Sequence, residues 1–157
     1  MCILVLSLSA QKSVIDCEKG DTLPTIPAGY VDLGLPSGTL WKDKNEGDVL
    51  YTYDQAMAKF GNDLPTKEQL EELQTACEWT WNGSGYNLEG PSGASIVLPA
   101  AGFHDCHGSI QSIGLRGFYW SSTPDNSDRA WSLYLSSSSL YVFNLYHCGG
   151  QSVRLVR

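Results

Sequence analysis

Histidine and cysteine side chains gather in two segments that lie about forty residues apart in the chain. His104, Cys106 and His107 are in the first segment, and His147 and Cys148 are in the second. Imidazole and thiolate groups are common zinc ligands, and four of them could close a tetrahedral site. Their spacing matches no standard zinc finger. We therefore expect neither a metal nor another cofactor.

Other kinds of catalysis have little support in the sequence. The chain contains many serines but no Gly-x-Ser-x-Gly segment, which holds the nucleophilic serine of α/β-hydrolases. Glu68, Glu71, Glu72 and Glu78 are spaced as the solvated face of one helix, where their like charges repel. We expect no enzymatic activity. The alternative, an enzyme, would require metal or thiol chemistry at the histidine and cysteine segments.

The last part of the chain has the composition of a binding surface. Beyond Glu89 there is no Lys, Glu or Met, whereas Ser, Gly, Tyr, Leu and Asn are frequent. Antibody paratopes use the same residues, because tyrosine gives a large contact area at a low entropy cost. A period of two places Tyr134, Tyr141 and Phe143 on one strand face, opposite Leu133, Leu135, Leu140 and Val142. The alternative is an amphipathic hairpin whose tyrosines cover the core.

Charge and length limit the partners and the architecture. The 157 residues carry a formal net charge of −7, which argues against nucleic acids and anionic membranes, because both require a basic surface. The 16 glycines and 7 prolines exclude a coiled coil. A chain of this length can build one domain with its own core.

Two helices are expected in the first half of the chain. Tyr53–Phe60 has apolar side chains at helical spacing and is followed by a glycine, which is a typical stop. Thr66 and Gln69 form a capping-box pattern at the start of a second helix, which should end near Cys77.

Short strands dominate from Trp79 onward, and the five tryptophans are assigned to the core: Trp41, Trp79, Trp81, Trp120 and Trp131. Ala101–Gly117 has few structural signals and is expected to be a long loop. Two helices followed by many strands predict an α+β domain. The strands are expected within Tyr30–Trp41, Trp79–Leu88, Ser95–Leu98, Phe118–Ser121, Ala130–Leu135, Leu140–Tyr146 and Val153–Val156.

The first ten residues form a short apolar segment that ends in small residues. Its length suits the hydrophobic part of a signal peptide and is too short to cross a bilayer. We favour a signal-like segment and linker over residues 1–28, followed by a domain over residues 29–157. A first β-strand is the alternative for the apolar segment.

Five motifs occur in order between residue 29 and the C-terminus: Gly29–Trp41, Leu64–Glu68, Leu98–Gly102, Tyr119–Thr123 and Ser152–Arg157. Together they resemble the FISUMP-type, or major paralogous, domains of surface and secreted proteins of gut-type bacteria and their phages. The stretch between Trp41 and Tyr53 is shorter than in that family. The resemblance implies a C-type lectin-like fold of the α+β class, with two helices, short antiparallel strands and long glycine-rich loops.

The same fold occurs in the variable proteins of diversity-generating retroelements. There, adenine mutagenesis of Asn-type codons produces many residue types but not Lys, Glu, Gln, Met or Trp. Between Ser121 and Ser152, only Trp131 and Gln151 are of these excluded types. The resemblance thus implies a hypervariable segment, although Ser- and Tyr-rich strands also occur without mutagenesis.

Lectin-like folds often bridge the long loop to the segment before the last strand. The resemblance therefore implies a disulfide between Cys106 and Cys148. We expect ligand contacts from the loop that starts at His104 and from the hairpin that ends at Cys148. These contacts are Tyr134, Ser137, Tyr141, Phe143, Asn144, Tyr146, His147, His104, Asp105 and His107.

These features together predict an exported, non-enzymatic domain at a cell surface, in a secreted protein or on a virion surface. It would bind a protein or glycan ligand through a Tyr/Ser-rich face, and the resemblance implies that it is the hypervariable target protein of a diversity-generating retroelement. No nucleic-acid partner and no membrane insertion of the mature domain are expected. The alternative is a structural module of a bacterial surface protein, without a ligand of its own.

Overall fold

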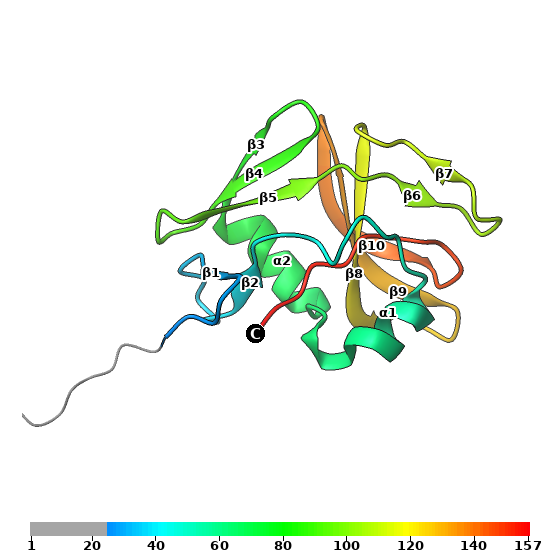
Figure 1. Cartoon of the computed structure of the whole chain (residues 1–157), viewed down its shortest axis with the longest axis horizontal. Coiled ribbons are helices and arrows are strands. Elements are labelled where there is room, and N and C mark those ends of the chain that lie inside the picture. Colours follow the sequence, from blue (N-terminus) through cyan, green and yellow to red (C-terminus); the bar gives the residue numbers. More distant parts are fainter. Residues whose placement is uncertain (1–24) are drawn as a thin grey trace, which may run out of the picture.

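The computed structural model describes residues 25–157, so the signal-like segment expected at residues 1–10 lies outside the described residues. The described chain contains ten strands and two α-helices (Figure 1). The strands are β1 (Tyr30–Asp32), β2 (Leu40–Lys42), β3 (Glu78–Trp81), β4 (Gly85–Glu89), β5 (Ser95–Pro99), β6 (Phe103–His104), β7 (Ile110–Gln111), β8 (Arg116–Pro124), β9 (Arg129–Ser136) and β10 (Ser139–Tyr146). They form four antiparallel sheets, in the orders β1–β2, β3–β4–β5, β6–β7 and β8–β9–β10.

The expectation of an α+β domain with a C-type lectin-like fold is wrong, because the described chain is mostly β. Its helices are α1 (Tyr53–Phe60), α2 (Lys67–Ala76) and a 3₁₀ turn at Gly61–Asp63. With 8 and 10 residues, α1 and α2 are only about two to three turns long. The expected loop at Ala101–Gly117 instead contributes β6 and β7.

Both α-helices begin at a threonine that caps them. The box expected at Thr66 and Gln69 is confirmed, because each side chain accepts a hydrogen bond from the backbone N–H of the other residue. Thr52 and Gln55 form the same box at the start of α1. A capping side chain is worth about 1 kcal/mol, so these short helices have well-defined starting points.

The β8–β9–β10 sheet lies at the centre of the fold and supports a separate core on each face. On one face Leu133 and Leu135 join the larger apolar core together with Leu73 of α2. On the other face Trp120 and Ala130 join a second core with side chains of α1. Figure 1 shows α1 near one end of this sheet and α2 below the β3–β4–β5 sheet.

The closing strand expected at Val153–Val156 is not formed. Residues 152–156 instead make isolated bridges, between Tyr119 and Ser152 and between Trp41 and Val156. Figure 1 shows it running through the middle of the molecule to the C-terminus. Because its bridges reach residues of different sheets, it ties those sheets together.

Arg154 lies at the centre of this segment and is 1% exposed. Its guanidinium donates to the Asn45 side-chain oxygen at 2.9 Å and to the carbonyl oxygens of Lys42, at 2.9 Å, and Val97. Burial lowers the pKa of Arg154, and burial raises the pKa of the neighbouring Tyr119 to about 12. Through these three hydrogen bonds, Arg154 joins β2, β5 and the C-terminal segment.

The tryptophans do not all lie in the core. Trp41 and Trp120 are fully buried, and Trp79 and Trp81 are partly buried against the larger core. The assignment of Trp131 to the core is wrong. Its ring lies under the Lys67 ammonium group, 3.8 Å from the ring centroid, because the start of α2 presents a lysine there instead of an apolar side chain.

Candidate functional site

Five aromatic side chains form one cluster on the central sheet, here named the aromatic face: Phe103, Phe118, Tyr134, Tyr141 and Phe143. The ring centroids of Phe103 and Phe118 are 4.9 Å apart, and those of Phe118 and Tyr134 are 5.1 Å apart. Tyr141 lies 4.9 Å from Tyr134 and 5.3 Å from Phe143. Aromatic pairs at such separations contribute about 0.5–1.5 kcal/mol each, so the rings support one another.

Strand register brings these rings together. Tyr134 of β9 pairs with Phe118 of β8 on one side and with Tyr141 of β10 on the other. Phe143 comes two residues after Tyr141 and so points to the same face. The expected alternation is confirmed on the opposite face, where the larger core takes in Leu133, Leu135, Leu140 and Val142.

The aromatic face opens to solvent on its β10 side. Tyr141 is 46% exposed, whereas Phe118 on the β8 side is 7% exposed. The other three rings of the aromatic face are half-buried. Because the inner rings already fix the outer ones, a ligand would find a surface that loses little side-chain freedom on binding.

The β6–β7 hairpin carries Phe103 to the aromatic face, and Asp105 organises its turn. The Asp105 carboxylate accepts hydrogen bonds from the backbone N–H groups of Ser109, at 3.0 Å, and His107, at 2.9 Å, and from Gln111 Nε2 at 2.9 Å. These hydrogen bonds hold the pKa of Asp105 below its usual value. The bond from Ser109 lowers the pKa most, and the bond from His107 lowers it less. Asp105 is thus occupied in shaping the turn.

The remaining loop and turn residues of the predicted site lie beside the aromatic face. His104 Nδ1 is 2.9 Å from the Gly108 carbonyl oxygen of its own hairpin, and His107 is exposed at that turn. Ser137 is exposed in the turn between β9 and β10. The structure therefore brings Phe103, rather than the histidines, into the cluster.

The disulfide expected between Cys106 and Cys148 is confirmed, with the two Cα atoms 4.9 Å apart. It ties the β6–β7 hairpin to the segment after β10. Both thiols are consumed in this bond, so the zinc site considered from the sequence lacks its cysteine ligands. Among residues 25–157, no cluster of three or more His, Cys, Asp or Glu side chains is arranged to hold a metal ion.

Asn144 and Tyr146 lie on the sheet face opposite the aromatic face. Asn144 Oδ1 accepts from Arg129 Nη1 at 3.1 Å, and its Nδ2 donates to Asp125 at 3.0 Å. The Arg129 guanidinium lies 4.1 Å from the ring centroid of Tyr146 and donates to its hydroxyl. These contacts form a polar network at the far end of β10, separate from the aromatic face.

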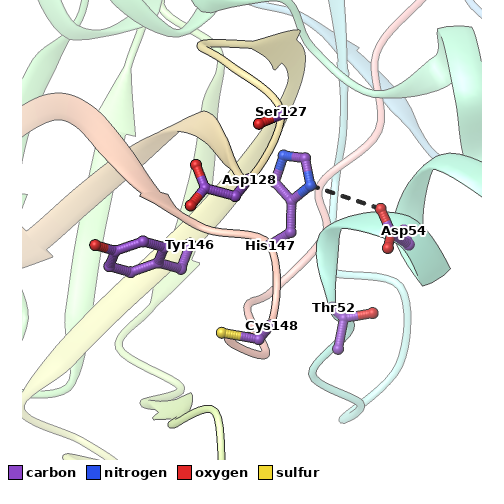
Figure 2. A pocket seen from close by; sticks show the side chains of 7 residues that line it. All are labelled: Thr52, Asp54, Ser127, Asp128, Tyr146, His147 and Cys148. Carbon is purple, nitrogen blue, oxygen red and sulfur yellow. Dashed lines mark ion pairs between the residues drawn. The ribbon is translucent and has the colours of Figure 1, made fainter.

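A pocket of about 510 Å³ surrounds His147, beyond the end of β10. Figure 2 shows His147 between the Asp54 and Asp128 carboxylates, with Tyr146 turned away from it. His147 Nδ1 is 3.7 Å from Asp54 Oδ1, and its ring stacks on Tyr53 with centroids 4.2 Å apart. The lining residues are Thr52, Asp54, Ser127, Asp128, Tyr146, His147 and Cys148.

His147 Nε2 is buried and has no hydrogen-bond partner in the described part of the chain. The His147 backbone instead joins two elements, since its N–H donates to Asp128 and its carbonyl accepts from Tyr53. We read His147 as a link between β10 and α1.

Comparison with known protein families gives one match. Residues 79–156 match the model of a family described as a domain of unknown function (DUF8237). No curated protein and no solved structure matches the chain. The resemblance to FISUMP-type domains and to retroelement proteins stays a prediction.

The matched segment covers just under half of the chain and contains the whole aromatic face. It begins within β3 and includes β8, β9 and β10, whereas α1, with Asp54 of the His147 pocket, lies outside it. Within residues 25–157, no helix has the length and apolar character needed to cross a membrane.

Sequence reasoning missed two members of the aromatic face, Phe103 and Phe118. Phe118 pairs directly with Tyr134, and the alternation within its strand could have assigned it to that face. Phe103 carries no such signal, because a bridge between His104 and Gly150 and the Cys106–Cys148 disulfide bring its hairpin into place. Both contacts join residues far apart in the chain.

Proposed function

We propose that this domain binds a protein or glycan ligand through the aromatic face. The observation that carries the proposal is the exposure of a packed aromatic cluster, with Tyr141 46% exposed at its outer edge. Exposed apolar clusters are a mark of contact surfaces. Aromatic residues also dominate the energy of known interfaces, because each ring removes a large apolar area from water.

The proposed contacts differ from the Tyr/Ser-rich face expected from the sequence, because Phe103 is added and several expected residues are left out. They comprise Phe103, Tyr134, Tyr141 and Phe143, with Ser137 at the adjacent turn. Phe118 is 7% exposed and forms the base of the cluster. Asn144 and Tyr146 are engaged with Arg129 on the opposite face, so we leave them out of the proposed contacts.

The proposal retains a hypervariable segment between Ser121 and Ser152. Its two residues of excluded types both have contacts that a substitution would disturb. Gln151 is 1% exposed and accepts a hydrogen bond from the Ser132 hydroxyl, and Trp131 packs under Lys67. Exposed positions such as Tyr141 could vary without changing either core, which supports the retroelement hypothesis.

Binding arrays test the proposal directly. The full chain is applied to a printed glycan array and to a display library of extracellular protein fragments. We expect the wild type to bind at least one probe and the Tyr141→Ser/Phe143→Ser variant to bind it about 30-fold more weakly or worse. This loss corresponds to about 2 kcal/mol, the threshold of an interface hot spot.

Val97→Ser is the control for this experiment. Val97 is 44% exposed, close to the 46% of Tyr141, but it lies on β5 in a different sheet. The Val97→Ser substitution should leave the affinity unchanged. Equal losses of affinity in both variants would contradict the proposal. A wild type that binds no probe on either array would instead favour the structural module without a ligand.

A further inference from the structure

Strand β10 is the outer strand of the central sheet and lacks the usual protection of such strands. Among the described residues its only strand partner is β9. Its eight residues contain no charge and no proline, and it pairs with β9 without a bulge from Ser139 to Tyr146. Outer strands normally carry charges, prolines or bulges, because they otherwise pair with another chain.

Main-chain groups on the free side of β10 are available for such pairing. A two-residue turn joins β9 to β10, which directs the N–H and C=O groups of Leu140, Val142 and Asn144 away from β9. Gln74 Nε2 donates to the Leu140 carbonyl at 3.0 Å, and a carbonyl oxygen can accept a second bond. Within residues 25–157, nothing else pairs with the outward groups of Val142 and Asn144.

We propose that β10 pairs with β10 of a second copy of this chain, antiparallel and across a two-fold axis at Val142. The strand is self-complementary in this register, because an aromatic residue stands on each side of Val142. Tyr141 of each copy lies opposite Phe143 of the other. Cross-strand aromatic pairs stabilise antiparallel strands, and a two-fold axis provides each contact twice.

Charge also fits this register. A net charge of −7 per chain disfavours self-association in general, so like charges must be kept apart at the interface. The charged groups near β10 are Asp125 and Arg129, which contact Asn144 and Tyr146, and the Lys67–Glu71 ion pair of α2, a helix that packs against β10. With the axis at Val142, the Asn144–Tyr146 end of the strand meets the uncharged serine turn of the second copy.

The pairing would also enlarge the exposed aromatic surface, whether or not a ligand is bound. Two three-stranded sheets would become one continuous sheet. Because the two-fold axis is perpendicular to that sheet, both aromatic faces would lie on the same side and meet at the seam. A dimer would therefore present one surface of twice the aromatic content.

Sedimentation equilibrium of the full chain tests this inference. For the wild type, we expect the apparent mass to rise with concentration from that of the 17.2 kDa chain toward twice that value. Val142→Pro removes the outward N–H and places a ring at the seam. It should raise the dissociation constant by at least about tenfold, because two symmetric hydrogen bonds are lost. Val142→Thr keeps the N–H and the branched shape and should dimerise like the wild type.

Amide hydrogen exchange in the wild type gives a second readout that does not depend on the proline variant folding. The Val142 and Asn144 amides should exchange more slowly as the concentration rises, whereas the Phe143 amide, bonded to β9, should not change. A wild type that stays monomeric at millimolar concentration overturns the inference. So does a dimer that survives Val142→Pro in folded protein, or protection that appears away from β10.

Discussion

Arg154→Met is expected to lower the free energy of unfolding by about 3–5 kcal/mol. The guanidinium is 1% exposed and satisfies Asn45 and the carbonyl oxygens of Lys42 and Val97. Methionine fills a similar volume but donates no hydrogen bond. Two of the orphaned acceptors belong to the backbone and cannot be removed by relaxation, and each buried acceptor without a partner costs about 1–3 kcal/mol.

Urea unfolding followed by tryptophan fluorescence measures this loss. Arg116→Met is the control, because Arg116 is exposed on β8 and exposed substitutions usually change stability by less than about 0.5 kcal/mol. Arg154→Lys should give an intermediate loss, since a lysine keeps the charge but cannot reach three separated acceptors. If Arg154→Met unfolded at the same urea concentration as Arg116→Met, this would contradict the structural role assigned to Arg154.

The Cys106→Ala/Cys148→Ala variant should lose about 4 kcal/mol. The disulfide closes a loop of 42 residues, and the chain-entropy model gives about this value for such a loop. The variant should also be locally less stable in the β6–β7 hairpin. The β6–β7 hairpin, which carries Phe103, should exchange its amide hydrogens faster in the variant, because the bond ties that hairpin to the end of β10.

Cys77→Ala separates the effect of the bond from that of removing a cysteine. Cys77 is a half-buried free thiol, and burial raises its pKa to about 11. Replacing it removes a small apolar group and should cost about 1 kcal/mol or less. The account of the disulfide fails if both variants show the same midpoint in a guanidinium titration, or if reduction of the wild type leaves that midpoint unchanged.

Local patterns in the sequence predicted the elements that depend on neighbouring residues. The capping box joins Thr66 to Gln69, only three positions away, so the start of α2 follows from the sequence. The hairpin of β9 and β10 follows from two alternating runs around a serine turn, and its two faces are as predicted. Each of these features requires knowledge of one short segment.

Features that depend on distant contacts were predicted poorly. The β6–β7 hairpin was expected to be a loop, because its two-residue strands are too short to show a period. Nothing near Arg154 in the sequence indicates a buried cation, since two of its partners come from residues Lys42 and Asn45. The predicted fold class was wrong for the same reason, because no single segment of the sequence determines how short strands pair into sheets.

The candidate site was also predicted only in part. Tyr134, Tyr141 and Phe143 share one face as the alternation predicted. Asn144 and Tyr146 were grouped with them because of their residue types, but an odd separation from Tyr141 places them on the opposite face. Composition identified the right strand, whereas only the period of the strand could assign its residues to faces.

A comparison of two tyrosines on β10 tests the central claim most directly. Tyr141 is 46% exposed and Tyr146 is 49% exposed, so the two substitutions to serine remove similar exposed surface from opposite faces of one strand. The measurement is the dissociation constant for the ligand found on the arrays. We predict that Tyr141→Ser weakens binding by about 30-fold, while Tyr146→Ser leaves it within about twofold. The opposite ranking would contradict the account and move the site to the His147 pocket.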